Sequence, residues 1–209
     1  MIMMETFKSL SGHIHIDGVL RKGAGTEGCD AIDPATEEVN GALVFASAAE
    51  VDEAVEAAKR AQKKWNRTNQ GTRAEELHEV ARRLREAMPR LAEAATREMG
   101  KPFKESANEV WWAASAFDYY AEIARHDAGR VVGPNVDGQM HVVTKDPLGV
   151  VGVILPYNFP FVLFGWEASA ALAAGNAVIM KPSELCSFSS LVLMECFDHL
   201  PKGLMQCIP

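Results

Sequence analysis

The fold of this chain is decided by residues 147–184, which read PLGVVGVILPYNFPFVLFGWEASAALAAGNAVIMKPSE. The pattern predicts a strand, a tight loop, a helix that ends at Gly175, a second strand and a second loop. The almost unbroken apolar run over residues 150–155 is typical of a parallel strand that is covered on both faces. The polar residues of the two loops are Asn158, Lys181, Ser183 and Glu184. Because parallel sheets bind ligands at the carboxyl ends of their strands, these loops are the predicted ligand site.

Two further elements extend this stretch into a βαβαβ unit. Residues 187–200 predict a helix that Pro201 stops, and residues 204–208 predict a third strand. Crossovers between parallel strands imply right-handed connections. Gly149 and Gly152 do not form a G-x-G-x-x-G fingerprint, and no P-loop occurs. The pattern alone therefore indicates a nucleotide-type α/β fold without naming the ligand.

The first part of the chain predicts short strands that belong to the same α/β domain. A hairpin over residues 13–21 turns at Asp17-Gly18. Further strands are expected near Ala31 and over residues 42–46. A second hairpin is expected over residues 131–144, where the polar setting suits a sheet edge or an arm that reaches a neighbouring subunit.

Three helices are expected between these hairpins. The first follows a capping box at residues 47–50. In the second, Pro89 predicts a kink or the start of a new helix. The third opens at Pro102, runs to about His126 and is rich in aromatic residues, which favour core or subunit contacts over the wall of a substrate tunnel.

Composition excludes several classes of function. A net charge of −7 argues against nucleic acid and anionic membranes as partners. The N-terminus is too short and too charged for a signal peptide, and residues 150–166 are too interrupted to span a bilayer. The four cysteines lack C-x-x-C spacing, and His13 and His15 lack a third ligand, so no metal site is expected. Cysteines that stay reduced fit a cytoplasmic protein.

Three motifs resemble the aldehyde dehydrogenase superfamily in order and spacing. They are PYNFP at 156–160, ALAAGNAV at 171–178 and KPSE at 181–184. The resemblance implies NAD(P)-dependent oxidation of an aldehyde to a carboxylic acid through a cysteine thiolate. It also implies an aldehyde as substrate and a homo-oligomer in the full-length parent. It also implies that residues 1–209 are the N-terminal part of the cofactor-binding domain, that residues 131–145 are an oligomerisation hairpin and that the catalytic domain is absent.

The resemblance assigns a catalytic role to Asn158. Its side-chain amide matches the asparagine that donates a hydrogen bond to the oxyanion formed from the aldehyde. From the residues alone, an asparagine between two prolines is better explained as a turn residue that tolerates a left-handed backbone.

The resemblance also implies a cofactor site. Lys181 and Glu184 match positions that hold the adenosine ribose, although the residues alone also fit a solvated loop pair. A carboxylate would repel a 2′-phosphate, which predicts NAD over NADP while leaving NADP possible. The full set of predicted cofactor residues is Ile154, Leu155, Pro156, Tyr157, Lys181, Ser183 and Glu184.

The substrate entrance of the family corresponds to Phe159, Val162 and Trp166, whose spacing lets them share one side of a helix. These residues favour an apolar or aromatic aldehyde. Tyr157 stands where tryptophan is frequent, and Glu167 reverses the charge of a frequent lysine.

None of the four cysteines matches the position of the nucleophile, so residues 1–209 alone are not expected to oxidise aldehydes. An interaction subunit that associates with a full-length relative is the alternative of a different class, because a sheet cut after three parallel strands leaves an open edge. A stand-alone NAD-binding module is a third possibility.

Overall fold

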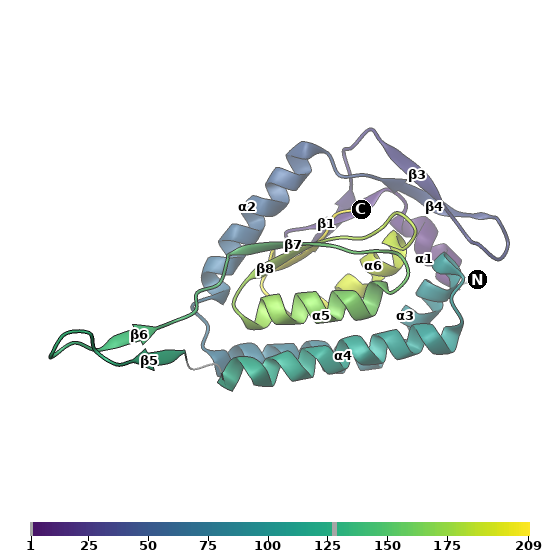
Figure 1. Ribbon diagram of the computed structural model, residues 1–209. Helices are drawn as coiled ribbons and strands as arrows, with labels where there is room; N and C mark the ends of the chain where they lie inside the picture. The colour runs from purple at the N-terminus through teal and green to yellow at the C-terminus, as the bar shows by residue number, and fades with distance from the viewer. Residues whose placement is uncertain (1, 127–128) are drawn as a thin grey trace.

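One mixed sheet of five strands organises the chain, and helices cover both of its faces (Figure 1). The computed structural model describes residues 2–126 and 129–209. Helix α2 crosses one face of the sheet, α5 and α6 lie on the other, and α3 and α4 pack outside them. In chain order the elements are α1 (Ile2–Leu10), β1 (His13–Ile16), β2 (Val19–Lys22), β3 (Gly28–Ile32), β4 (Val39–Val44), α2 (Ala48–Trp65), α3 (Gln70–Met99), α4 (Phe103–His126), β5 (Arg130–Val132), β6 (His141–Val143), β7 (Val150–Ile154), α5 (Pro160–Ala173), β8 (Ala177–Lys181), α6 (Ser187–Leu193), a 3₁₀ turn (Met194–Phe197) and β9 (Met205–Cys207).

The strand order in the sheet is β2-β1-β9-β8-β7. Strands β7, β8 and β9 are parallel, which confirms the predicted βαβαβ unit. The N-terminal hairpin adds to the same sheet, because β1 pairs antiparallel with β9. Asp17 and Gly18 both have positive φ, at 51° and 72°, as the predicted tight hairpin turn requires.

The packing of α5 between the sheet and α4 forms the centre of the core. Phe161, Phe164 and Leu172 of α5 are at most 1 % exposed. Gly165 lies so close to α4 that a Cβ atom there would be 2.6 Å from the Cα atom of Ala113. This close contact fixes α5, and with it the loop that precedes it, against the helical layer.

Helix α3 runs without interruption through Pro89, so the predicted start of a new helix at this residue is wrong. Asn69 caps its beginning by accepting a hydrogen bond from the backbone N–H of Thr72, and Gly100 ends it in the left-handed region at φ 74°. Pro89 is exposed, whereas Leu84 and Leu91 on either side of it are fully buried. Packing of this apolar face offsets a cost of about 3 kcal/mol for a proline inside a helix.

Local pattern also missed or misplaced three other elements. Helix α1 was not predicted, although Phe7 at its centre is fully buried and stacks on Phe188. Strand β4 covers residues 39–44 rather than 42–46. Helix α6 ends at Leu193, and the 3₁₀ turn replaces the predicted continuation to residue 200.

Helix α6 takes its N-terminal cap from another helix. Cys186 at the cap position provides no side-chain hydrogen bond. Instead the Glu98 carboxylate of α3 accepts hydrogen bonds from the backbone N–H groups of Phe188 and Ser189, both at 2.7 Å. Burial raises the pKa of Glu98 to about 7, against the lowering effect of these hydrogen bonds.

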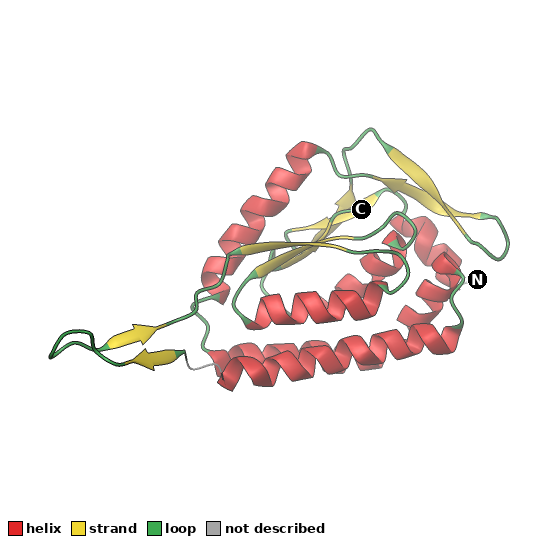
Figure 2. Ribbon diagram, viewed as in Figure 1, coloured by secondary structure: helices red, strands yellow, loops and turns green. Residues whose placement is uncertain are grey.

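The predicted second hairpin projects from the body as an arm formed by β5 and β6 (Figure 2). Every residue in these two strands is exposed. Val131, Met140 and Val142 are among its apolar side chains, at 70 %, 77 % and 55 % exposure. The two strands pair only with each other among the described residues, so the arm gains little from the core.

Candidate functional site

A cleft of about 920 Å³ opens at the carboxyl ends of β7 and β8. Its floor is the sheet, and its wall is the beginning of α2 together with the segment after β4. A Cβ atom at Gly152 would meet nothing within 4 Å, so the floor is open at this point. The cleft is lined by Cys29, Phe45, Ala46, Val51, Val55, Val150, Gly152, Val153, Ile154, Ile179, Lys181, Glu184, Ile208 and Pro209.

Strand pairing brings three of the predicted cofactor residues together. Ile154 at the end of β7 pairs with Lys181 at the end of β8, and both are exposed and line the cleft with Glu184. Leu155 points the other way and is only 3 % exposed, because successive residues of a strand alternate between faces. Its backbone N–H donates to the carbonyl oxygen of Lys181 at 3.0 Å, which ties the two strand ends together.

The turn after β8 presents Glu184 as a charged acceptor. The backbone N–H of Glu184 itself, then the Ser183 hydroxyl, at 3.1 Å from a carboxylate oxygen, and then Lys181 lower the pKa of Glu184. Ser183 does not line the cleft, but its backbone oxygen accepts from the N–H of Cys186 at 3.0 Å and so shapes the turn. Glu184 is therefore ionised at neutral pH and can accept two hydrogen bonds from a diol.

The apolar wall of the cleft was missed in the sequence. Val51 and Val55 of α2 both line the cleft, and Val51 is 39 % exposed. Phe45 and the end of the chain at Ile208 and Pro209 reach it from other parts of the sequence. No local pattern marks these residues, because the cleft wall forms only when α2 packs across the sheet.

The loop after β7 carries Asn158 on the surface. Pro156, Tyr157 and Asn158 are all exposed. The Asn158 side chain makes no hydrogen bond within residues 2–126 and 129–209, so its amide is free to donate to a ligand. Its backbone oxygen instead accepts a hydrogen bond from the Lys101 ammonium group.

Glu109 of α4 caps α5 from below this loop. Phe159 at the cap position provides no side-chain hydrogen bond, but the backbone N–H of Phe161 donates to the Glu109 carboxylate at 3.2 Å. Glu109 is 2 % exposed and pairs with Lys101. Burial raises the pKa of Glu109, while the hydrogen bond from Lys101 and its charge act to lower it.

The three predicted substrate residues differ in exposure. Phe159 and Trp166 are 42 % and 51 % exposed, but Val162 is 3 % exposed and packs inside. Phe159 lies before the regular part of α5, with φ −140° and ψ 57°. The spacing rule on which the prediction of a shared side was based therefore does not apply to Phe159.

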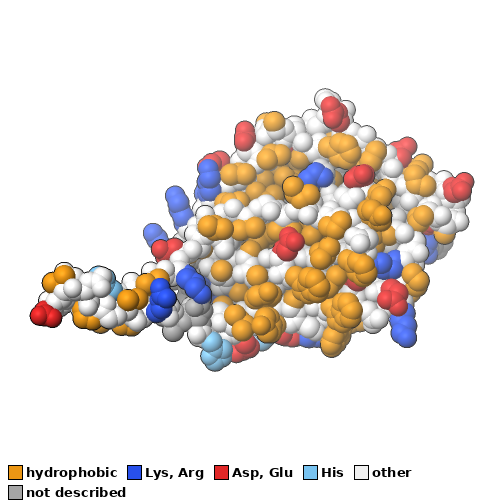
Figure 3. All heavy atoms as spheres, viewed as in Figure 1, with side chains coloured by type: hydrophobic (Ala, Val, Ile, Leu, Met, Phe, Trp, Pro, Cys, Tyr) orange, Lys and Arg blue, Asp and Glu red, His pale blue; other side chains and the backbone are white. Residues whose placement is uncertain are grey.

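Trp166 belongs to an aromatic hollow of about 610 Å³ between α4 and α5. Trp112 and Tyr119 expose 49 % and 59 % of their surface there. Hydrophobic side chains cover much of this face of the molecule (Figure 3). Glu167, the next residue after Trp166, is exposed. The aromatic residues of α4, predicted to favour core or subunit contacts, are thus partly on the surface.

All four cysteines are free, and each has a raised pKa. Burial raises the pKa of Cys186 and of Cys196 to about 12 and raises that of Cys207 as well. Cys29 lines the cleft, but burial, Glu184 and Asp30 raise its pKa too. None of these thiols is set up as a thiolate nucleophile. Within the described residues, no group of histidine, cysteine or acidic side chains is placed to hold a metal ion.

A cleft at the carboxyl ends of parallel strands is the arrangement at which α/β proteins of the dinucleotide-binding class bind ligands. The model of the aldehyde dehydrogenase family matches residues 21–209. The chain belongs to this family.

Curated relatives agree. Aminoaldehyde dehydrogenase 2 of Solanum lycopersicum is 38 % identical over 202 residues, which cover 93 % of this chain and 40 % of the relative. The peroxisomal aminoaldehyde dehydrogenase 1 of Malus domestica is 35 % identical over 206 residues, 93 % of this chain and 41 % of the relative. The chain thus spans about two fifths of the length of these relatives.

Solved structures show the same correspondence. Betaine aldehyde dehydrogenase from Staphylococcus aureus in complex with NAD+ superposes with a TM-score of 0.91 at 29 % identity, covering 99 % of this chain and 42 % of that one. An aldehyde dehydrogenase from Brucella melitensis gives 0.90 at 29 % identity, with 96 % and 42 % covered. In the part of the chain that the structure describes, no helix combines the length and the apolar character that crossing a bilayer requires.

Proposed function

We propose that residues 1–209 form the N-terminal part of the cofactor-binding domain of an NAD(P)-dependent enzyme that oxidises an aldehyde to a carboxylic acid. One observation carries this proposal. The register that pairs Ile154 with Lys181 places the free amide of Asn158 and the carboxylate of Glu184 in loops at the same edge of the sheet. An amide that can donate a hydrogen bond and a carboxylate that can accept one therefore follow the ends of two paired strands, and the carboxylate of Glu184 lines the apolar cleft.

Each residue has a defined task in this proposal. The Asn158 amide donates to the aldehyde oxygen as negative charge develops on it, which in comparable sites is worth about 10²–10³ in rate. Glu184 accepts hydrogen bonds from the two ribose hydroxyls, Lys181 lies beside it, and the apolar cleft residues contact the adenine side. The cofactor, when bound, supplies the acceptor for the hydride. The nucleophilic thiol comes from outside residues 1–209, because the cysteines described above are poorly suited to ionise.

The preferred cofactor is NAD. Glu184 is kept ionised by the groups around it, and its charge opposes the charge of a 2′-phosphate. The cleft offers Lys181 as its positively charged side chain, and that ammonium group donates to the carbonyl oxygen of Pro182 at 3.2 Å. NADP is thus accommodated less well than NAD.

Ligand binding to the 209-residue chain tests the cofactor site directly. ADP-ribose titrated into ¹⁵N-labelled protein is expected to shift the amide resonances of Ile154, Lys181 and Glu184. ADP-ribose with a 2′-phosphate is expected to bind more weakly, and Glu184→Gln should narrow the difference because it removes the repulsion. Shifts confined to other regions, or tighter binding of the 2′-phosphate, would contradict the proposal.

Two classes of aldehyde fit the aromatic hollow. Phe159 and Trp166 favour an apolar or aromatic aldehyde, as the sequence predicts. A cationic substrate end is favoured by a separate observation, because Trp112, Tyr119 and Trp166 expose ring faces and Glu167 adds a negative charge next to them. Two relatives are named aminoaldehyde dehydrogenases. Quenching of tryptophan fluorescence by 3-aminopropanol but not by 1-butanol would favour the cationic class, and the reverse would favour the apolar class.

A second candidate function is a non-catalytic subunit that associates through the arm. Its support is the exposed apolar surface of β5 and β6, together with the position of β7 at the edge of the described sheet. In either function, residues 131–145 are the proposed oligomerisation hairpin. Mass measurement by light scattering, with Val131→Ser and Val142→Ser as interface variants, tests this role. A monodisperse monomer at high concentration would contradict it.

A further inference from the structure

Lys101 makes three contacts, two with the Asn158 loop and one with Glu109 of α4. Its ammonium group donates to the backbone oxygen of Asn158 and to the Glu109 carboxylate. It also lies 4.0 Å from the centre of the Phe159 ring, a distance at which a cation is attracted to the face of the ring. Two consecutive loop residues are thus fixed by one side chain from the turn between α3 and α4.

Glu109 of α4 makes a second link. One carboxylate oxygen pairs with Lys101 and the other accepts from the backbone N–H of Phe161. Because α5 has no cap of its own, this negative charge also satisfies the positive end of the helix dipole. The Lys101–Glu109 pair therefore contacts Asn158 and Phe159 before Pro160 and Phe161 after it.

We infer that Lys101 and Glu109 are positioning residues that set the orientation of the Asn158 side-chain amide. This inference rests on the proposed role of Asn158 as an oxyanion donor. An oxyanion donor is effective only when its direction is fixed before the reaction. Among the described residues, no other hydrogen bond reaches residues 156–158, all of which are exposed.

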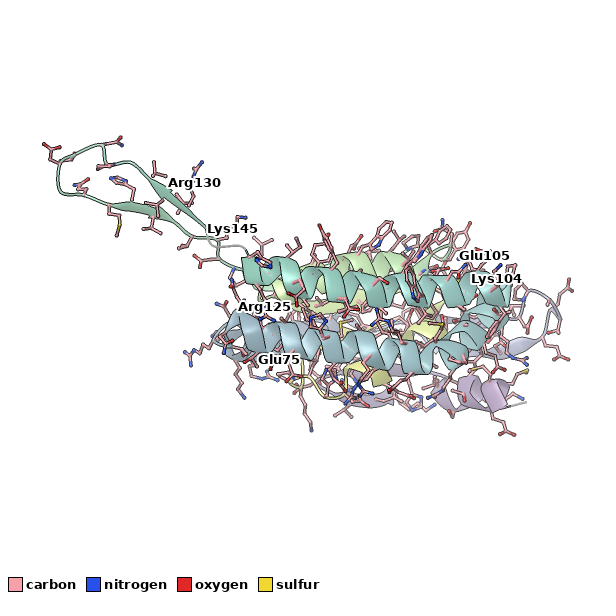
Figure 4. The ribbon with its side chains drawn as sticks, turned by 90° about the horizontal axis from the view of Figure 1, so that it is seen from below. Glu75, Lys104, Glu105, Arg125, Arg130 and Lys145 are labelled. Atoms are coloured by element: carbon pink, nitrogen blue, oxygen red, sulfur yellow. The ribbon has the colours of Figure 1, made fainter. Side chains whose placement is uncertain are left out.

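Electrostatic chemistry explains why an ion pair is used here. A buried carboxylate without a partner is costly, and a neutral replacement often stabilises a fold as well as an ion pair does. What the ion pair adds is a defined orientation of the Asn158 loop, because its donor and acceptor atoms select one loop conformation. Lys104 and Glu105, one turn into α4, provide the contrast: both are exposed, and no ion pair joins either side chain to another described residue (Figure 4).

The test compares variants of the 209-residue chain by NMR without ligand. Lys101→Met is expected to shift the side-chain amide resonances of Asn158 and to speed amide exchange at Phe161 by about tenfold or more, because a charge-assisted hydrogen bond is disturbed. Lys101→Arg keeps the charge and should restore both signals toward the parent protein. Lys104→Met and Glu105→Gln are the matched controls and should change neither.

Unchanged Asn158 and Phe161 signals in Lys101→Met would overturn the inference. Equal effects of Lys101→Met and Lys101→Arg would overturn it too, since a purely steric role does not depend on charge. If Lys101→Met does not fold, Glu109→Gln supplies the same comparison, because its amide keeps an acceptor for Phe161 but loses the charge. The ADP-ribose titration reads out Lys181 and Glu184 separately, so failure of the cofactor proposal is distinguishable from failure of this one.

Discussion

Two buried glutamates, Glu98 and Glu109, cap helices other than their own, and within the described residues only Glu109 has an ion-pair partner. Glu98 of α3 binds the first N–H groups of α6, and Glu109 of α4 binds the start of α5. Lys101 pairs with Glu109, while Glu98 is held by hydrogen bonds alone. Helix α5, which follows the Asn158 loop, is therefore restrained by a carboxylate that belongs to an ion pair. Helix α6 is restrained by a carboxylate that only accepts hydrogen bonds. We interpret the Lys101–Glu109 pair as positioning the Asn158 loop, and Glu98 as contributing to the stability of the fold.

The largest expected effect is the loss of the cation. Lys101→Met leaves the Glu109 carboxylate buried without its partner, and breaking such a pair costs about 3 kcal/mol in the free energy of unfolding. Urea denaturation followed by circular dichroism measures this change. Lys104→Met is the control and should stay within about 0.5 kcal/mol of the parent protein. If Lys101→Met lowers the free energy of unfolding no more than Lys104→Met does, the ion pair does not distinguish the Glu109 cap from the Glu98 cap.

The second effect is a pH dependence that belongs mainly to Glu98. Its pKa in the folded protein is raised from 4.5 to about 7, so its contribution to stability is fully present below pH 4.5 and is lost as pH rises toward 7. The free energy of unfolding should fall by on the order of 2–3 kcal/mol across this window. Glu98→Gln should flatten the slope measured by denaturation at several pH values.

Glu109→Gln provides the comparison for that slope. The pKa of Glu109 is raised in the same direction by burial, but Lys101 opposes the rise, so its contribution to the slope should be smaller. The charged or titratable groups near Glu109 are Lys101 and Cys186, whose pKa is itself raised in part by Glu109. Equal slopes in the two variants would show that Lys101 does not keep Glu109 ionised.

The smallest expected effect lies on the surface. His78 of α3 contacts Asp118 and Glu122 of α4 at 2.6 and 2.8 Å, and the hydrogen bond to Glu122, then that to Asp118, raise its pKa. The pair contributes stability below pH 6.5 that is lost as pH rises through the higher pKa of the folded protein. Because the side chain is 39 % exposed, His78→Gln should cost less than about 1 kcal/mol at pH 5.5. A larger loss in the free energy of unfolding would mean that this surface ion pair contributes as much to stability as the buried pair of Lys101 and Glu109.

The sequence predicts what depends on neighbours along the chain. The capping box of Ser47 and Glu50 was predicted and is present, with the two N–H contacts at 3.3 and 2.9 Å. The parallel unit was predicted for the same reason, since strand and helix periodicity are local. The exposed positions of Asn158 and Glu184 follow from the motifs and the ends of the strands.

Contacts between distant residues were beyond local pattern. Lys101 and Asn158 are 57 positions apart, and neither Lys101 nor Glu109 differs in type from the solvated residues around them. The same limit explains Pro89, where packing of Leu84 and Leu91 against neighbouring helices overrides a local signal for a break. The prediction for Phe159 has another cause of error, because helical spacing was applied at a position that is not helical.

The N-terminal caps of α5 and α6 come from residues outside the β7–β9 segment, which bears on whether this segment can be moved between proteins. Helices α5 and α6 each begin at a residue that gives no side-chain cap, and both depend on glutamates from the α3–α4 layer. The segment from β7 to β9 therefore cannot be transferred to another protein without losing the caps of its helices. Exchange of this segment between relatives requires that the two glutamates travel with it, so the unit of inheritance is larger than the unit that resembles a nucleotide-binding motif.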